Sequence, residues 1–556
     1  MTAADRDPEP LAETPDDCGA FPRLADAHMS TLSQFGERRR TCKDEVLIRE
    51  GERERDFYVT LSGLVAVVEG YGTDEERLIR VHGPGRFLDE LSLLTSQPAF
   101  VTSVVVEAGE ILAVPVDRLR AVATRDPNLA DVILRAFLIR RELLIGLGAG
   151  FRIVGSRYSP DARRLREFAA RNRLPHRWID LEKDPAAEAL LRQLGISPEE
   201  TPVVIWRSEL VLRNPSNAEL AEAIGLPMRS SPDQMCDLVV VGAGPAGLAA
   251  AVYGASEGLS TTVFDAVATG GQAGTSSRIE NYLGFPAGIS GAELAERAVI
   301  QAEKFGAGIS VPIEVTGLDP RNGHYAVRLD DGTEVRARTV VMATGARYRR
   351  LPVPRLEEFE GKSVYYAATV MEAYVCNQQP IAIVGGGNSA GQAAVFLSEH
   401  ASRVRLIVRE GDLGENMSRY LVDQILRKPN VEVFLNTEVR ELVGKEGELD
   451  HLVVEDIRTG DRRLIEAALL FVFIGATPCT GWLAGTLQLD DNGYVRTGPD
   501  AGENAGVLET SLPGVLAVGD VRSGSIKRVA SAVGEGSMAV RLIHEHLAKV
   551  GAVAEQ

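Results

Sequence analysis

The sequence predicts an α/β fold with two parallel β-α-β units, preceded by a unit of short strands and by a smaller unit of alternating strands and helices. Three observations support this. Two apolar strand-like runs, Asp237–Val241 and Pro380–Val384, each lead into a glycine-rich turn and a helix-compatible stretch. Short apolar runs alternate with glycine turns from Met29 to about Leu147. Strand and helix patterns alternate from about Phe151 to Leu226.

The N-terminal end has the composition of an unstructured segment. Residues 1–27 are acidic, contain proline and lack the basic-then-apolar order of a signal peptide. We therefore predict a disordered tail over residues 1–27.

Residues 28–150 are predicted to form a β-roll that ends in a helix. Strand-like runs such as Asp56–Val68 are followed by a helical pattern from about Asn128 to Leu147, whose apolar face we expect to pack against the roll. No helix-turn-helix pattern follows, which argues against a transcription factor. The region resembles the cyclic-nucleotide-binding domain of bacterial regulators and channels at Gly51, Glu52, Tyr58, Gly63 and Phe87–Leu94.

One departure from that domain concerns the phosphate. The resemblance implies that Glu90 would accept from the ribose hydroxyl, whereas the arginine that pairs with the cyclic phosphate is replaced by Ala99. The lost charge-assisted contact is worth roughly 1.5–3 kcal/mol, or about tenfold to a hundredfold in affinity. Binding of a cyclic nucleotide is therefore not expected, and the alternative is a β-roll kept for dimerisation or docking.

The unit at residues 151–227 resembles a thioredoxin or glutaredoxin fold. Its predicted order is strand, helix, strand and helix, and then Thr201-Pro202 precedes a strand at 203–206. The resemblance implies a cis peptide before Pro202 and a C-x-x-C motif where this chain has Ser159 to Ala162. A serine hydroxyl cannot replace a reactive thiolate, and Ser159 or Asp161 is explained as a helix N-cap. We expect a binding or spacer unit, followed by a linker at 228–232.

Two dinucleotide fingerprints follow. In the first, the strand ends at Gly242-Ala-Gly244-Pro-Ala-Gly247, and Asp265 closes the next apolar strand. Glycines permit the tight turn, the helix N-terminus faces the pyrophosphate, and the carboxylate holds the ribose. The second copy, Gly385–Ala390, is a G-x-G-x-x-A variant. Two Rossmann-type domains are therefore predicted.

Together with Gly270–Gln272, Ala343–Ala346 and Gly519-Asp520, these motifs resemble the low-molecular-weight thioredoxin reductase family over about residues 235 to 550. The resemblance implies a homodimer with an FAD-binding domain at 235–350 and 477–556 and an inserted NAD(P)-binding domain at 351–476. The implied FAD residues are Gly242, Gly244, Pro245, Ala246, Gly247, Asp265, Gly271, Gln272, Asn281, Thr344, Gly345, Gly519, Asp520, Lys527 and Arg528. The implied NAD(P) residues are Gly385, Gly387, Asn388, Ser389, Ala390 and Arg409.

The redox-active cysteine pair of that family is missing. Its two positions fall at Ala367 and Val370, and neither residue can form a thiolate. Cys376 lies nearby, and Cys479 occupies the Pro-Cys-Thr turn. Each is interpreted as a small packing residue, with a relocated redox pair as the alternative.

The choice between NADH and NADPH depends on the residues that follow the apolar strand after the second fingerprint. Asp265 lies 23 residues after Gly242, and the same offset from Gly385 reaches Val408. Arg409 follows and suits a 2′-phosphate, which favours NADPH over NADH. However, the family pattern His-Arg-Arg with a later arginine is here Val408-Arg409-Glu410 with Gly414, so failure to bind either nucleotide stays open.

Composition excludes several classes. The net charge of −18 argues against nucleic acid or an anionic membrane as main partner. Five cysteines without a C-x-x-C motif argue against a disulfide framework or a metal site. No apolar run is long enough to span a bilayer, and we expect a cytoplasmic protein.

Two hypotheses about function follow. The first is an FAD-dependent NAD(P)H oxidoreductase with an acceptor other than thioredoxin, such as a ferredoxin, because hydride transfer to flavin requires stacked rings rather than cysteines. The second is a flavin-binding redox sensor or scaffold with little turnover. Thioredoxin-disulfide reductase activity is expected to be absent.

Overall fold

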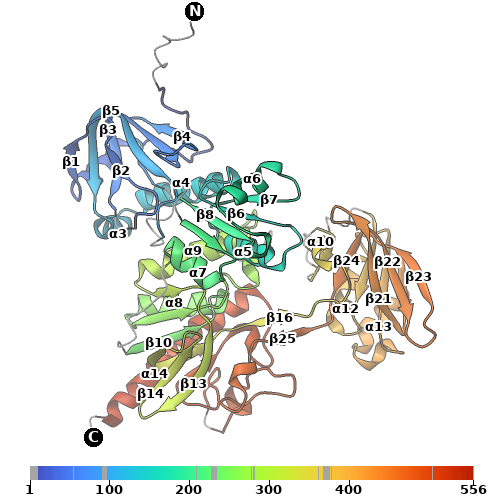
Figure 1. The fold of residues 1–556 in the computed structure, drawn as a ribbon. Helices are drawn as coiled ribbons and strands as arrows, with labels where there is room; N and C mark the ends of the chain where they lie inside the picture. Colours follow the sequence, from blue (N-terminus) through green and yellow to red (C-terminus); the bar gives the residue numbers. More distant parts are fainter. Residues whose placement is uncertain are drawn as a thin grey trace, which may run out of the picture.

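The computed structural model describes residues 11–53, 55–89, 97–207, 210–226, 235–276, 279, 282–360, 362–366, 368, 373, 376, 378–503 and 505–554. Figure 1 shows a β-roll, a small α/β unit beside it, a central sheet covered by helices, and a second parallel-sheet lobe set apart from the rest. This arrangement confirms the predicted α/β fold class. The predicted linker at 228–232 lies outside the described residues.

The β-roll consists of five strands with helices at one end. Its sheet has the order β1-β5-β3-β4, and β2 pairs with β5. Helix α4 begins after Asp126, whose side chain accepts from the Leu129 amide, and Phe137 on this helix packs against Phe57 and Phe87. The expected packing of this helix on its own β-roll is therefore confirmed. The elements are α1 (Asp26–Ser33), β1 (Glu37–Arg40), β2 (Val46–Ile48), β3 (Phe57–Glu69), β4 (Arg77–His82), β5 (Thr102–Val114), α3 (Val116–Arg125) and α4 (Pro127–Gly146).

The prediction of a disordered tail over residues 1–27 was wrong for residues 11–27. The Thr14 amide donates to the Val81 carbonyl at 3.0 Å, and Glu13 forms an ion pair with Arg86 at 2.7 Å. Ala20 and Leu24 are buried. This acidic segment is held by a backbone hydrogen bond to β4, by the ion pair with Arg86 and by burial of Ala20 and Leu24. Amino-acid composition reveals none of these contacts.

The small α/β unit has a four-stranded sheet in the order β7-β6-β8-β9, with β6 parallel to β7 and antiparallel to β8. Ser159 caps α5 by accepting from the Ala162 amide, as expected, and the Thr201–Pro202 peptide is cis. The sequence analysis missed β9 and α7, although a capping box starts α7. The elements are β6 (Phe151–Gly155), α5 (Pro160–Arg171), β7 (His176–Asp180), α6 (Pro185–Gln193), β8 (Val203–Trp206), β9 (Leu210–Arg213) and α7 (Asn217–Ile224).

The central sheet has the order β12-β11-β10-β15-β14-β13, and β26 pairs in parallel with β15. Helices α8 and α14 pack together so closely that a Cβ on Gly536 would overlap the Ala246 carbonyl oxygen. The elements are β10 (Cys236–Val241), α8 (Pro245–Ser256), β11 (Thr261–Phe264), α9 (Gly291–Lys304), β12 (Gly308–Ser310), β13 (Val315–Arg321), β14 (His324–Leu329), β15 (Glu334–Met342), β26 (Val515–Ala517) and α14 (Val529–Ala554). No described helix is long and apolar enough to cross a membrane.

The second lobe lies between β15 and β26 in the chain, as an insertion. Its parallel sheet has the order β17-β24-β18-β19-β20, with a β21-β22-β23 meander beside it. The antiparallel pair β16–β25 connects it to the central sheet (Figure 1). The elements are β16 (Ala346–Tyr348), α10 (Leu356–Phe359), β17 (Val364–Tyr365), β18 (Pro380–Val384), α12 (Asn388–Leu397), β19 (Arg403–Ile407), η3 (Leu413–Glu415), α13 (Arg419–Arg427), β20 (Val431–Phe434), β21 (Thr437–Lys445), β22 (Glu448–Asp456), β23 (Arg462–Glu466), β24 (Leu469–Val472) and β25 (Ala476–Pro478).

Candidate functional site

The first glycine turn connects β10 to α8 and has no space for a Cβ at Gly242 or Gly247. Gly242 has φ +108°, and a Cβ there would overlap the Ala343 carbonyl oxygen. A Cβ on Gly247 would overlap the Gly242 carbonyl oxygen, so α8 can approach the strand only with glycine at this position. Gly244 is the N-cap of α8 and offers no capping side chain, which leaves the amides of the first turn for an anionic group.

Asp265 lies over this turn. Its Oδ2 accepts from the Ala243 amide at 2.8 Å, while Oδ1 accepts from the Val267 and Ala268 amides at 2.9 and 3.0 Å. A carboxylate has about four acceptor positions, so capacity for a ribose hydroxyl is left. The structure thus brings the predicted ribose-binding acid to the predicted pyrophosphate turn.

Three further residues of the predicted FAD set, Gln272, Asp520 and Lys527, have contacts of their own. Gln272 Nε2 donates to the Ala346 carbonyl at 2.7 Å. Lys527 Nζ donates to the Tyr494 hydroxyl at 3.1 Å. Burial raises the pKa of the Asp520 carboxyl, and the positive charge of Lys527 opposes this rise. Burial, together with the charge of Asp520, also raises the pKa of Tyr348, so that this tyrosine stays neutral beside the site.

Tyr348 and Tyr366 form a stacked pair that the sequence analysis missed. Their ring centroids are 6.0 Å apart at an interplanar angle of 9°, and the Tyr366 hydroxyl donates to Glu360 at 2.5 Å. Tyr366 immediately precedes Ala367, but Ala367 and Val370 lie outside the described residues, as do Glu90 and Asn281. No local sequence signal identifies this pair, because Tyr348 ends β16 whereas Tyr366 follows the end of β17.

Several features of the first site fit an FAD molecule. A Cβ on Gly244 would reach only the Gly271 Cα, at 3.8 Å, so the space before α8 is open, and the Thr344 hydroxyl is buried without a partner among the described residues. Gly345 and Gly519 have φ angles of +69° and +71° and therefore favour glycine. Arg528 directly precedes α14, the helix that packs on α8.

The second glycine turn connects β18 to α12 and repeats the geometry of the first. Gly385 has φ +143°, and a Cβ there would overlap the Phe473 carbonyl oxygen. Gly387 is the N-cap of α12, and Ala390 is fully buried against the turn. Asn388 Oδ1 accepts from the amide and hydroxyl of Ser418, at 2.7 and 2.8 Å. Ser389 lies in the first turn of α12. The backbone is thus arranged for a second dinucleotide.

The segment after β19 determines which side chains meet that dinucleotide. Val408 is buried, whereas the Arg409 side chain is 70% exposed and lies 3.7 Å from Glu410. A Cβ built on Gly386 would lie 2.7 Å from Glu410 Oε2. The sequence analysis identified Arg409 as the ligand of a 2′-phosphate but treated Glu410 only as a reversed charge.

The alternative considered for Cys376 and Cys479 is a relocated redox pair. None of the five cysteines is in a disulfide, and Cys376 is buried in the core of the inserted lobe. The Cys479 amide donates to the Gly345 carbonyl at 3.0 Å, and burial raises the pKa of its thiol. Among the described residues, no cluster of His, Cys, Asp or Glu could hold a metal ion.

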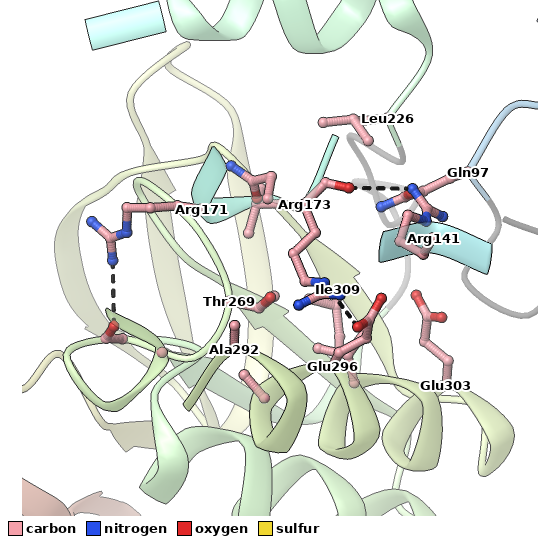
Figure 2. Close-up of a pocket in the computed structure, with 16 residues that line it drawn as sticks. Gln97, Arg141, Arg171, Arg173, Leu226, Thr269, Ala292, Glu296, Glu303 and Ile309 are labelled. Carbon is pink, nitrogen blue, oxygen red and sulfur yellow. Dashed lines mark hydrogen bonds and ion pairs between the residues drawn. The ribbon is translucent and has the colours of Figure 1, made fainter. Parts of the chain in front are cut away.

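The small α/β unit contacts the loop that follows Asp265. Arg171 donates to the Gly271 carbonyl at 3.4 Å, and Asn172 Nδ2 donates to the Val267 carbonyl at 3.1 Å. Figure 2 shows the adjoining cavity of about 80 Å³, where Arg173 pairs with Glu296 of α9 at 2.9 Å. Burial raises the pKa of the Glu296 carboxyl. The sequence analysis missed this junction because its residues are about 100 positions apart in the chain.

Internal contacts surround Ala99 and Arg55 in the β-roll. Ala99 is fully buried, and Phe100 lies 6.3 Å from Trp206 of the small α/β unit. Arg55 and Asp89 form a buried ion pair at 3.1 Å, so the charge of this guanidinium is balanced inside the β-roll.

Comparisons with known proteins agree with this geometry. A family model described as pyridine nucleotide-disulphide oxidoreductase matches residues 236–536, and a cyclic nucleotide-binding domain model matches residues 38–126. The 34.2 kDa protein in the rubredoxin operon of Clostridium pasteurianum is 32% identical over 315 residues, covering 57% of this chain and 98% of the relative. A thioredoxin reductase of Streptomyces clavuligerus is 33% identical over 313 residues, covering 56% and 94%.

Solved structures lead to the same family. The crystal structure of thioredoxin reductase from Streptococcus pyogenes MGAS5005 has a TM-score of 0.50 and 31% identity, covering 57% of this chain and 99% of that one. Members of the thioredoxin reductase-like group use FAD and NADPH. The chain therefore belongs to the pyridine nucleotide-disulphide oxidoreductase family, as a thioredoxin reductase-like flavin oxidoreductase module behind an N-terminal cyclic nucleotide-binding domain.

Proposed function

We propose that this chain is an FAD-dependent NAD(P)H oxidoreductase that passes electrons from flavin to an acceptor other than thioredoxin. One observation carries the proposal: both glycine turns retain dinucleotide geometry, while Ala367 and Val370 replace the pair of thiols through which thioredoxin would be reduced. The chemistry of hydride acceptance is thus supported, whereas the usual exit for electrons is absent.

In this proposal the residues of the chain bind the FAD molecule and orient its flavin ring. When bound, FAD supplies the chemistry of accepting a hydride and releasing electrons one or two at a time. The turn at Gly242 and the first amides of α8 suit a pyrophosphate, and Asp265 suits a ribose hydroxyl. Gln272, Asp520 and Lys527 lie at the end suited to the flavin ring. No acid-base side chain is needed, because hydride transfer depends on the positions of two stacked rings.

The acceptor we propose is a one-electron carrier such as a ferredoxin, with quinones and dioxygen as other chemical classes that exchange electrons with flavin directly. We further propose a homodimer, which the thioredoxin reductase-like relatives support, and a cytoplasmic location.

A second function is favoured by the contact between the small α/β unit and the loop after Asp265. Because Asn172 donates to the Val267 carbonyl, a change in that unit could be transmitted to the flavin site. This supports a flavin-binding redox sensor or scaffold with little turnover.

Steady-state assays separate these functions. The purified flavoprotein is given NADH or NADPH with ferricyanide, a quinone, a ferredoxin or oxidised thioredoxin as acceptor. Turnover with the first three and none with thioredoxin is expected. Robust reduction of the thioredoxin disulfide would overturn the proposed acceptor class, and absence of turnover with every acceptor would favour the sensor.

A further inference from the structure

The segment between β19 and η3 brings a carboxylate to the second glycine turn. Glu410 Oε2 lies 2.7 Å from the position of a Cβ built on Gly386, the middle residue of Gly385-Gly386-Gly387. The backbone here is held in place, because the Asn436 amide donates to the Glu410 carbonyl and the Thr437 amide donates to the Val408 carbonyl, both at 3.0 Å. The position of Glu410 is therefore determined by its strand neighbours.

The first glycine turn shows what a carboxylate at this place does. There, Asp265 Oδ2 accepts from the amide of Ala243, the middle residue of Gly242-Ala243-Gly244. An acid at the end of the strand after such a turn accepts from the ribose 2′-hydroxyl. Glu410 is two residues further along than Val408, but its longer side chain returns to the equivalent middle glycine.

The surrounding charges oppose a 2′-phosphate. Arg409 is close to Glu410, at 3.7 Å, and is otherwise 70% exposed. Asp412 and Glu415 add two exposed acids to the same segment, and Asp412 Oδ1 accepts from the Gly414 amide at 2.9 Å. The negative charge of a 2′-phosphate would be repelled by the carboxylates of Glu410, Asp412 and Glu415, and the Arg409 guanidinium is already paired. A neutral 2′-hydroxyl could instead donate a hydrogen bond to Glu410.

We propose that Glu410 accepts a hydrogen bond from the 2′-hydroxyl of the adenosine ribose and makes the second site select NADH over NADPH. The inference rests on the proposed function, since it requires a nicotinamide nucleotide at the second turn. It sets this chain apart from thioredoxin reductase-like relatives, which use NADPH. Arg409 then balances Glu410 and is no longer the ligand of a phosphate.

Equilibrium binding tests this selection without turnover. Calorimetric titration of the oxidised flavoprotein with NAD⁺ and NADP⁺ is expected to give at least about tenfold tighter binding of NAD⁺, the size of one charge-assisted hydrogen bond. Glu410→Gln should weaken NAD⁺ binding about tenfold and narrow the preference, and Glu410→Arg should reverse it. Glu399→Gln, which removes an exposed acid of the same lobe outside this segment, is the matched control and should leave the preference for NAD⁺ unchanged.

Three results would overturn the inference: tighter binding of NADP⁺ by the unaltered protein, a preference unchanged in Glu410→Gln, or binding of neither nucleotide. Flavin absorbance and thermal midpoint report whether each variant is folded, and the isosteric Gln variant remains informative if the Arg variant is not. The proposed oxidoreductase function fails separately: selective NAD⁺ binding without reduction of the flavin by NADH supports the role of Glu410 and contradicts that function.

Discussion

The two glycine turns of this chain have the same backbone and different side chains. In both, the first glycine has a positive φ and faces a carbonyl oxygen of the neighbouring strand, Ala343 in one and Phe473 in the other. In the first, Asp265 accepts from three amides, whereas in the second the acid comes from Glu410, paired with Arg409. The backbone determines that a dinucleotide can bind, and the residues after the following strand determine which one.

The surroundings of the turns also differ. The loop beside the first turn is contacted by a second folded unit through Arg171 and Asn172. The second turn lies in the lobe connected by the β16–β25 pair. The first site is thus in direct contact with another folded unit, whereas the second lies in an inserted lobe that the β16–β25 pair joins to the central sheet.

The largest expected effect comes from adding a Cβ to either turn. Gly242→Ala would force a methyl group against the Ala343 carbonyl at φ +108° and should reduce FAD binding by more than about a hundredfold, or prevent folding. Gly385→Ala should abolish nicotinamide nucleotide binding and retain FAD. Flavin content of the purified proteins and nucleotide titration measure these effects, and each variant is the control for the other. Loss of FAD from Gly385→Ala would contradict independent sites.

The β-roll should show a pH-dependent contribution to its stability. Burial raises the pKa of Glu50 to about 7 from 4.5, while the Trp206 indole and the charge of Arg207 oppose the shift. The folded protein then binds the proton more tightly than the unfolded chain, so stability is greatest below pH 4.5 and falls as pH rises to about 7, by up to about 3 kcal/mol.

Glu50→Gln tests this effect. Urea unfolding followed by tryptophan fluorescence at pH 5 and pH 8 should show a smaller difference between the two pH values in the variant than in the unaltered protein. An equal difference in both proteins would exclude Glu50 as its source.

A smaller effect is expected where the small α/β unit meets the first site. Arg171→Ala with Asn172→Ala removes two hydrogen bonds to loop carbonyls and should weaken FAD binding about tenfold. Arg163→Ala removes an exposed ion pair with Glu357 and is the control, with FAD affinity unchanged. Fluorescence of released FAD measures both. Equal FAD affinity in the double variant and the control would show that the two sites are equally independent of this unit.

The smallest effect is expected from the cysteines. Replacing Cys376 and Cys479 by serine and alanine should leave the rate of flavin reduction within about twofold, because neither thiol has a cysteine partner. Rapid-mixing absorbance checks this. If the variants reduced their flavin at the normal rate but no longer passed electrons to an acceptor, the alternative of a relocated redox pair would be supported.

Sequence alone predicted the parts of the sites that are encoded locally. Gly242, Gly385 and Asp265 are recognisable because strand, turn, helix and acid follow at known spacing. The sequence pattern assigned no role to Glu410, because the expected position of the acid is Val408. Glu410 lies two residues later, and only the structure shows that its side chain reaches Gly386. The Tyr348–Tyr366 stack and the Arg171 contact with Gly271 join distant segments, so no local pattern could reveal them.

The most direct test of the account is sequential anaerobic mixing, with flavin absorbance as the signal. The protein is mixed first with NADH or NADPH and then with ferricyanide or oxidised thioredoxin. We predict that flavin is bleached by NADH and that its colour returns with ferricyanide but not with oxidised thioredoxin. Rapid reoxidation by the thioredoxin disulfide, or a flavin that neither nucleotide bleaches, would contradict it.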